Sequence, residues 1–339
     1  MRVARYYGPD DVRVEEAPRP EIGPGELLVR VGACGICGSD TMDWYLRQKM
    51  RDGRPLVLGH EPAGEVVAAG AGAPFAPGTR VFVHHHVPCG ACRFCRRGHE
   101  TLCQTFHATN IDPGGFAEYI RVPAPNASRD VLALPPALSF AAATVIEPLA
   151  CCVRALGRVA LHPGDVAAVV GSGAMGLLFV QLLRLRGAGR IVVSEPVPFR
   201  REMARRLGAD EAVAPAEAGE VLGPGGADAV IVCAGSGAAT EQGLTLAGPG
   251  ATVLLFAPPP PGVMVAIEPY RLFFGEQTVV SSYSAGPADT REALRLLATG
   301  QVQAEALITH QFELARAGEA LRLAREAGAS LKVLVLPSE

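Results

Sequence analysis

Four cysteines lie close together in one short stretch of the chain, "PCGACRFCRRGHETLC", at residues 88–103. Their C-x2-C-x2-C-x7-C spacing favours a metal site, because four thiolates complete the tetrahedral shell of a structural zinc ion. An iron–sulfur cluster, whose common spacing ends in x3-C-P, and free redox thiols are the alternatives. A closed shell leaves no position for a substrate, so this ion would support the fold. Its ligands would be Cys89, Cys92, Cys95 and Cys103.

A glycine motif, "VVGSGAMGLL", stands between an apolar run and a helical segment and reads G-x-G-x-x-G. Gly171 permits a tight turn, Gly173 lets the backbone approach a pyrophosphate, and Gly176 lets the helix pack closely on the strand. The helix N-terminus then offers free N–H groups to the phosphates. The motif predicts a dinucleotide site, which also includes Met175.

An acidic residue, Glu195, follows Gly176 at the end of the next predicted strand, where it would accept hydrogen bonds from an adenosine ribose. A 2′-phosphate there would be repelled by the carboxylate, which favours NAD over NADP. Arg200 and Arg201 lie close by in the sequence and keep NADP as the alternative, with Arg200 a candidate cofactor ligand.

Three further stretches hold side chains that can bind a catalytic metal. Cys37 lies in "ACGICGSD", His60 and Glu61 lie in "VLGHEPAGEV", and Glu147 lies in "VIEPLACC". These residues are far apart in the chain, so only the fold could assemble them. Taken singly, they also fit a buried thiol, a loop histidine and a helix N-terminal acid.

The elements that must position these residues change in character near residue 149. Residues 1–149 form short strands broken by Gly and Pro, which predict an antiparallel, barrel-like unit. Residues 150–285 alternate strands with helices, which predicts a parallel sheet. Residues 286–339 add two amphipathic helices and a closing strand. The sequence therefore predicts an α/β protein of two domains.

Three consecutive histidines, residues 84–86, resemble a metal-binding tract but fall within an expected strand at residues 80–88. In a strand, His85 would point away from His84 and His86. We therefore expect strand and loop here, without a metal.

Composition limits the classes of function. The chain has 339 residues, of which 49% are hydrophobic, and a net charge of −3, so it can bury two cores and has no basic excess for nucleic acid or an anionic membrane. Its first residues lack the apolar segment of a signal peptide. Nine cysteines in such a chain indicate a reducing, cytoplasmic setting.

Six motifs occur in the order typical of the zinc-dependent medium-chain alcohol dehydrogenases, and the sequence most closely resembles their sorbitol (polyol) and threonine dehydrogenase branch. The resemblance implies a GroES-like β-barrel catalytic domain at 1–149, completed by 286–339, and a Rossmann NAD-binding domain at 150–285. It also implies two zinc ions per chain, a small alcohol substrate and a homo-oligomer, either a dimer or a tetramer. The motifs are "GICGSD", "GHEPAGEV", the four-cysteine stretch, "GGFAEYIRVP", "EPLA" and "GSGAMG".

The resemblance also implies roles for the scattered residues. Cys37, His60 and Glu61 are expected to bind a catalytic zinc ion, with Glu147 bound directly or through water. Ser39 resembles the hydroxyl that passes on the substrate proton. Many relatives carry a histidine five residues after the cysteine to receive it, whereas this chain has Met42. Glu147 with water is therefore the expected base, and Glu61 or water alone are the alternatives.

The substrate pocket is indicated by three aromatic residues. Trp44 and Phe106 resemble the pocket walls of the sorbitol branch. Ser282 and Tyr283 stand where polyol dehydrogenases carry an Arg–Tyr pair, so the arginine that binds a polyol hydroxyl is missing. The expected reaction moves a hydride from a secondary alcohol, such as a polyol or cyclitol, to NAD. L-threonine 3-dehydrogenase is the alternative enzyme, and a non-catalytic redox sensor that binds NAD(H) and zinc is the alternative from another class.

Overall fold

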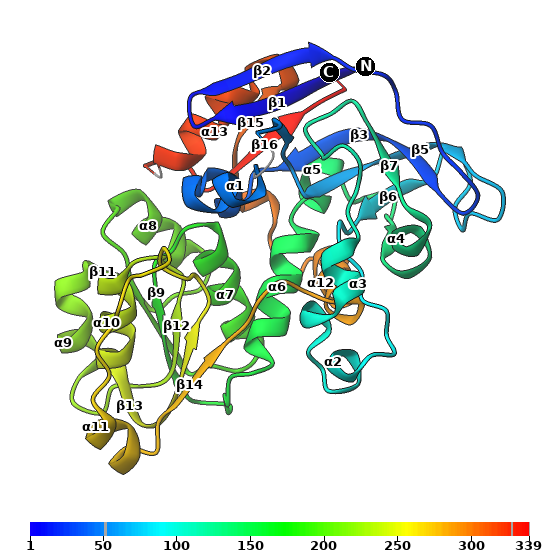
Figure 1. The fold of residues 1–339 in the computed structure, drawn as a ribbon. Coiled ribbons are helices and arrows are strands. Elements are labelled where there is room, and N and C mark those ends of the chain that lie inside the picture. Colours follow the sequence, from blue (N-terminus) through cyan, green and yellow to red (C-terminus); the bar gives the residue numbers. More distant parts are fainter. Residues whose placement is uncertain (51–52, 327, 339) are drawn as a thin grey trace. The chain divides into compact units, whose positions relative to one another are not determined.

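The computed structural model describes residues 1–50, 53–326 and 328–338 (Figure 1). Contacts divide the chain into two compact units. One combines Met1–Ala150 with Ala285–Glu339, and the other is Cys151–Ser284. None of the described helices combines the length and the apolar composition that crossing a membrane requires.

The first unit is built on a seven-stranded sheet in the order β15-β16-β3-β5-β6-β8, in which β7 also pairs with β3. A smaller sheet has the order β2-β1-β4. All pairs are antiparallel except β15 with β16. The strands are β1 (Arg2–Gly8), β2 (Asp11–Glu16), β3 (Leu27–Gly35), β4 (Leu56–Val57), β5 (Glu61–Ala69), β6 (Arg80–Val83), β7 (Tyr119–Val122), β8 (Val131–Ala133), β15 (Ile308–Glu313) and β16 (Lys332–Leu336).

Apolar side chains of both segments of this unit share one core, which includes Val29 of β3 and Val335 of β16. The final strand β16 pairs with β3 through Leu334 opposite Gly35. The last strand of the chain therefore lies beside the strand that leads to Cys37. The helices of this unit are η1 (Gly38–Thr41), α1 (Asp43–Lys49), α2 (Arg93–Arg96), η2 (Glu100–Leu102), α3 (Gln104–Ala108), α4 (Ala124–Arg129), α5 (Phe140–Ala143), α12 (Pro287–Ala298), η4 (Glu305–Leu307), η5 (Leu314–Arg316) and α13 (Ala317–Glu326).

The second unit holds a six-stranded, fully parallel sheet in the order β11-β10-β9-β12-β13-β14, flanked by helices (Figure 1). This is the strand order of a doubly wound nucleotide-binding fold, with its switch point between β9 and β12. The helix α6 (Ile146–Leu156) crosses the boundary between the units. The other elements are β9 (Val166–Val170), α7 (Ala174–Leu185), β10 (Arg190–Ser194), α8 (Pro198–Arg206), β11 (Glu211–Val213), η3 (Pro215–Glu217), α9 (Ala218–Leu222), β12 (Ala227–Val232), α10 (Gly237–Leu246), β13 (Ala247–Leu255), α11 (Pro269–Phe274) and β14 (Thr278–Ser281).

The expected strand at 80–88 is wrong in its second half, because β6 ends at Val83 and the histidines lie in the following loop. The ring of His84 turns to Asp130, and the ring of His86 contacts the Thr109 carbonyl oxygen. The rings of His85 and His86 have centroids 4.2 Å apart, so they do not alternate across a sheet.

Two other boundaries differ from expectation. The apolar and β-branched pattern of residues 278–285 predicts a strand, but β14 ends at Ser281, and Ser284 has a positive φ of 55°. The amphipathic pattern of residues 313–328 predicts one helix, whereas the structure has α13 preceded by the short η5, and residue 327 lies outside the described residues.

Candidate active site and metal centres

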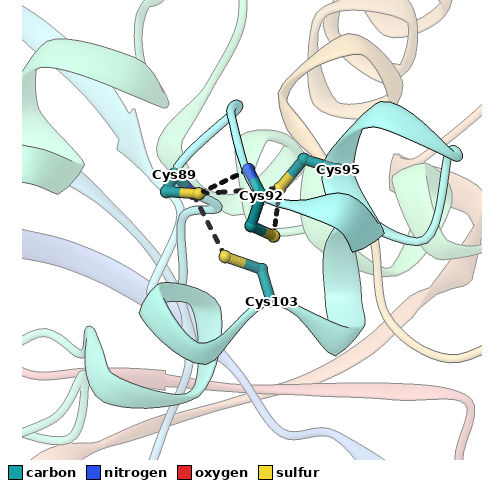
Figure 2. A group of neighbouring side chains, drawn as sticks. All are labelled: Cys89, Cys92, Cys95 and Cys103. Atoms are coloured by element: carbon teal, nitrogen blue, oxygen red, sulfur yellow. Dashed lines mark hydrogen bonds between the residues drawn. The ribbon is translucent and has the colours of Figure 1, made fainter.

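The four cysteines of residues 88–103 converge on one point between α2 and η2 (Figure 2). The sulfur of Cys95 lies 3.5 Å from that of Cys92 and 3.9 Å from that of Cys89. Zinc–sulfur bonds of about 2.3 Å in a tetrahedron place sulfurs about 3.8 Å apart. All four thiols are free. The arrangement therefore fits a tetrahedral ion.

Backbone N–H groups prepare some of these thiols for metal binding. Those of Ala91 and Cys92 lie 3.4 and 3.3 Å from the Cys89 sulfur and lower its pKa. Burial raises the pKa of Cys103, but N–H groups such as that of Cys89 outweigh it and bring the value to about 6. Burial and neighbouring thiols raise the pKa of Cys95 to about 12. Thiolates are the form that binds metal, so the lowered pKa values of Cys89 and Cys103 favour the metal-binding form of these two ligands.

A second group joins Cys37, His60 and Glu61, whose ligand atoms all lie within 4.8 Å of one another. Strand register explains the assembly. Gly35, near the end of β3, pairs with Glu61 at the start of β5. Cys37 follows β3 directly and His60 precedes β5, so the β3–β5 pairing brings distant parts of the sequence together.

The Glu61 carboxylate is fully buried and held from one side by Lys332 of β16, with which it forms an ion pair. The Lys332 ammonium also donates to the Ile36 carbonyl oxygen at 3.0 Å. Burial raises the pKa of Glu61 despite the lysine. Burial works against the charge of Lys332, but Glu61 and Cys37 nonetheless raise its pKa. A Cβ atom at Gly35 would lie 1.9 Å from a Glu61 oxygen, so only glycine leaves room for this carboxylate.

The His60 ring is oriented by Asp40, a residue that the sequence analysis did not single out. The His60 Nδ1 atom lies 3.5 Å from one Asp40 oxygen, and the other accepts the Cys37 N–H at 3.0 Å. Burial opposes both charges, but each group's attraction for the other lowers the pKa of Asp40 and raises that of His60 well above its usual range. A histidine held in this way on one nitrogen presents the other to a metal.

Glu147 lies in the first turn of α6 and is buried. A carboxylate oxygen of Glu147 groups with ring nitrogens of His84 and His85, all within 4.8 Å. Burial is the main cause of the raised pKa of Glu61, and the charge of Glu147 adds to it. Ser39 is half-buried in η1, two residues after Cys37.

The three aromatic residues expected in a substrate pocket fall in different units. Trp44, in α1, is half-buried, with its ring 5.8 Å from that of Tyr45. Phe106, in α3, is fully buried and lies 5.0 Å from the His86 ring. Tyr283 belongs to the second unit and is 52% exposed.

The glycine motif forms the turn between β9 and α7 in the second unit. Gly171 has a φ of +92°, which disfavours any side chain. A Cβ at Gly176 would lie 2.0 Å from the Gly171 carbonyl oxygen, and a Cβ at Gly173 would lie 3.7 Å from an Arg200 nitrogen. Met175 lies in the first turn of α7. The turn thus keeps its backbone accessible at Gly173, with a guanidinium nearby.

Glu195 is the first residue after β10 and is 3% exposed. One of its oxygens accepts the Ser172 N–H at 2.7 Å, and the other accepts the Val197 N–H at 2.9 Å. Burial lowers the pKa of Arg200, and the attraction of Glu195 opposes this shift. The carboxylate is therefore fixed against the glycine turn.

Comparisons with known proteins agree with this architecture. The model of the alcohol dehydrogenase GroES-like domain matches residues 23–135, and that of the zinc-binding dehydrogenases matches residues 174–299. L-threonine 3-dehydrogenase of Pyrococcus abyssi is 34% identical over 94% of this chain and 95% of its own. Sorbitol dehydrogenase of Bacillus subtilis is 30% identical over 100% and 98%. A structure assigned as a zinc-binding dehydrogenase from Sinorhizobium meliloti 1021, bound to NADP, has a TM-score of 0.86 and 34% identity, covering 99% of each chain.

The chain therefore belongs to the zinc-dependent medium-chain alcohol dehydrogenase superfamily, and it is an oxidoreductase. Its relatives include both threonine and sorbitol dehydrogenases, the branch that the sequence motifs predicted. The predicted fold class, a GroES-like sheet domain with a Rossmann sheet, is confirmed.

The contact between Lys332 and Glu61 leads to a stability prediction. Lys332→Met is expected to destabilise the metal-free protein by about 3–5 kcal/mol, because it leaves a buried carboxylate without its partner. The measurement is the thermal or urea midpoint after removal of metal. Lys49→Met, at the only other lysine, which is exposed, is the matched control and should leave the midpoint nearly unchanged. Equal midpoints for both variants would contradict this account of the ion pair.

Proposed function

We propose that this chain is a zinc- and NAD-dependent dehydrogenase that moves a hydride from a secondary alcohol to NAD and releases the ketone. The observation that carries the proposal is the convergence of Cys37, His60 and Glu61 on one point. A thiolate, an imidazole and a carboxylate occupy three positions around a tetrahedral ion. The fourth position then remains for an oxygen of the substrate.

A zinc ion bound there would supply Lewis-acid catalysis by lowering the pKa of the alcohol hydroxyl. The protein's own residues prepare the site. Asp40 fixes the His60 ring, and Lys332 holds one side of the Glu61 carboxylate. We propose that Ser39 passes the substrate proton on and that Glu147 with water receives it. Met42 cannot carry a proton, so no histidine relay starts at that position.

We propose that the four-cysteine group holds a second, structural zinc ion. The sulfur separations of 3.5 and 3.9 Å support this assignment, as does the absence of a fifth donor group from the described residues of that cluster. Two zinc ions per chain then have separate tasks. The ion at Cys37 serves the reaction, and the ion at residues 88–103 stabilises the fold.

We propose NAD as the cofactor, bound at Gly171, Gly173, Met175 and Gly176. Support comes from Glu195, whose buried carboxylate is fixed beside the glycine turn by two backbone N–H groups. An anionic side chain there disfavours a 2′-phosphate. Arg200 lies close to Gly173 and is suited to the pyrophosphate. Because one similar structure was solved with NADP, the preference needs a direct test.

Glu195→Gln is expected to raise the ratio of kcat/KM for NADP to that for NAD by about tenfold or more, since tenfold corresponds to about 1.4 kcal/mol of removed repulsion. The glutamine oxygen can still accept the Ser172 N–H, whereas the contact with the Val197 N–H is lost, so the KM for NAD is measured as well to report any change in the loop. Initial rates with both cofactors measure the ratio. Glu220→Gln, at an exposed glutamate of the same unit, is the control. An unchanged ratio in both variants would assign cofactor choice to other residues.

The substrate class is a small secondary alcohol, either a polyol or a cyclitol, with L-threonine as the second candidate. The second candidate is supported by the 34% identity to an L-threonine 3-dehydrogenase. A polyol is supported by the sorbitol dehydrogenase match, although Ser282 replaces the arginine expected beside Tyr283. We propose that Trp44, Phe106 and Tyr283 contribute to substrate selection.

The deciding experiment is a panel of polyols, cyclitols and L-threonine, followed at the NADH absorbance band with zinc-loaded protein. Turnover with one class and not with the others identifies the substrate. No turnover across the panel, with NAD bound, would contradict the proposal and favour a redox sensor. We further propose a cytoplasmic homo-oligomer, either a dimer or a tetramer, with a catalytic domain of residues 1–149 completed by 286–339 and an NAD-binding domain of residues 150–285.

A further inference from the structure

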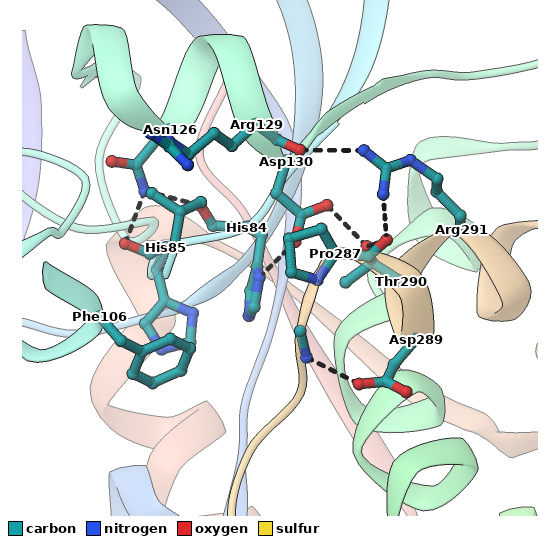
Figure 3. A network of polar contacts seen from close by, with 12 residues as sticks. His84, His85, Phe106, Asn126, Arg129, Asp130, Pro287, Asp289, Thr290 and Arg291 are labelled. Carbon is teal, nitrogen blue, oxygen red and sulfur yellow. Dashed lines mark hydrogen bonds and ion pairs between the residues drawn. The ribbon is translucent and has the colours of Figure 1, made fainter. Parts of the chain in front are cut away.

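A buried polar network surrounds His84 in the loop after β6 (Figure 3). The His84 Nδ1 atom lies 2.7 Å from an Asp130 oxygen, and both side chains are fully buried. The other Asp130 oxygen accepts the Thr290 hydroxyl at 2.6 Å. A carboxylate beside Nδ1 keeps the proton on that nitrogen. The lone pair of the ring is therefore on Nε2.

The Nε2 atom of His84 is buried and has no hydrogen-bond partner among the described residues. The same holds for Nδ1 of the adjacent His85. A buried polar atom without a partner costs about 1–3 kcal/mol, so two in neighbouring residues require an explanation. A ligand that accepts imidazole lone pairs provides one.

A third donor completes the group. A Glu147 carboxylate oxygen and ring nitrogens of His84 and His85 lie within 4.8 Å of one another. The backbone that carries the histidines is fixed, because the Asn126 amide donates to the carbonyl oxygens of His84 and His85 at 3.1 and 2.9 Å (Figure 3). The three donor atoms thus lie close enough together to share one ion.

We propose that His84, His85 and Glu147 form a further binding site for a divalent transition-metal ion, in addition to the Cys37 and four-cysteine sites. Two imidazoles and one carboxylate suit Zn²⁺ or Co²⁺ better than Mg²⁺ or Ca²⁺, which prefer all-oxygen shells. The hydrogen bond from His84 to Asp130 is the outer contact that metal-binding histidines use. Because a carboxylate has two oxygens, Glu147 can give one to this ion and keep the other for the water of the proposed proton relay.

Local charge supports a further cation. Four carboxylates in this part of the fold are buried, namely Asp40, Glu61, Asp130 and Glu147. Asp130 contacts His84, Asp40 lies beside His60, and Glu61 is paired with Lys332. Lys332 is the only buried lysine or arginine among the described residues. The His85 ring lies 4.9 Å from the His60 ring, so the new site adjoins the Cys37 site. Buried charges need compensation, and an ion bound by His84, His85 and Glu147 would add positive charge here.

The test is metal stoichiometry of the full chain. Protein freed of metal by a chelator is dialysed against rising Zn²⁺, and bound zinc is counted by mass spectrometry. We expect three ions per chain in the wild type. In His84→Gln we expect two, because the affinity for the third ion should fall at least about tenfold. His162→Gln, at a histidine that is 80% exposed, is the matched control and should keep three. A wild type that saturates at two ions, or a His84→Gln variant that still binds three, would overturn the proposal.

A second variant guards against misfolding, because His84→Gln also removes the bond to Asp130. His85→Asn keeps that bond and should lose the same ion, with an unchanged circular dichroism spectrum. Titration with Co²⁺ gives an independent signature. The first two ions should add thiolate charge-transfer absorption, whereas the third should add ligand-field bands alone. Thiolate absorption with the third ion would assign it to cysteine instead. These counts do not depend on any substrate, so failure of the substrate panel and failure of this site are separate results.

Discussion

Cys37→Ser should lower kcat by about 10³-fold or more while leaving the affinity for NAD within about twofold. Loss of the thiolate removes one of three ligands of the proposed catalytic ion. Lewis-acid stabilisation is worth several kcal/mol, and each 1.4 kcal/mol is tenfold in rate. The glycine motif belongs to the other unit of the chain, so cofactor binding should persist. Turnover with the best panel substrate and calorimetric NAD titration measure the two quantities.

The matched control is Cys34→Ala, at a cysteine three residues before Cys37 in the chain. The Cys34 thiol is fully buried and donates weakly to the Gly35 carbonyl oxygen at 3.7 Å. It is outside the group of Cys37, His60 and Glu61, so its loss should leave kcat within a few-fold and lower stability slightly. Near-normal turnover in Cys37→Ser would remove the basis of the proposed reaction.

Cys95→Ser should instead act on stability. The Cys95 sulfur lies close to those of Cys89 and Cys92, and its removal breaks a closed shell of four. Structural zinc contributes directly to folding. A loss of about 3 kcal/mol corresponds to a fall of about 4 °C in Tm for a chain of 339 residues, at an unfolding entropy of about 2.1 cal/mol/K per residue. Scanning calorimetry measures the shift, and kcat of the protein that remains folded at low temperature should be close to the wild-type value.

Chelation provides the control for this variant. Removal of the structural ion from the wild type should lower Tm by a similar amount. The same treatment of Cys95→Ser should lower its Tm little further, because this site is already disrupted. If Cys95→Ser lost turnover with an unchanged Tm, and Cys37→Ser lost stability alone, the roles assigned to the two centres would have to be exchanged.

The parts of the site that sequence predicts are those with local spacing. The four cysteines fall within sixteen residues, and the glycine motif falls within six, so their patterns report geometry directly. The structure places both as compact groups at the expected turns. The parallel sheet could be predicted equally well, because strands buried on both faces alternate with amphipathic helices in the sequence.

The group of Cys37, His60 and Glu61 could not be derived from spacing, because it depends on the register of β3 against β5. Only the family resemblance indicated it. Asp40 had a usable signal, since an acid three residues after a ligand cysteine can turn back to its N–H. Lys332 also had a usable sequence signal, because it is one of only two lysines among 31 basic residues.

The histidines at 84–86 show where periodicity fails. Alternation of faces holds only while the strand continues, and β6 ends at Val83. Beyond it, ring positions follow individual partners, which for His84 is Asp130, 46 residues further along the chain. Such a contact is invisible in a local pattern, so the grouping with Glu147 emerged only from the three-dimensional structure.

The position of β16 beside β3 has a consequence for biosynthesis. Lys332 reaches Glu61 only after residues 285–339 have been translated and have returned to the first unit, whereas the uninterrupted segment Cys151–Ser284 can fold earlier on the ribosome. Nascent chains stalled before the last strand would carry Cys37, His60 and Glu61 without the ammonium that balances them. The surroundings of the proposed catalytic site are thus completed only once β16 has been synthesised and has paired with β3.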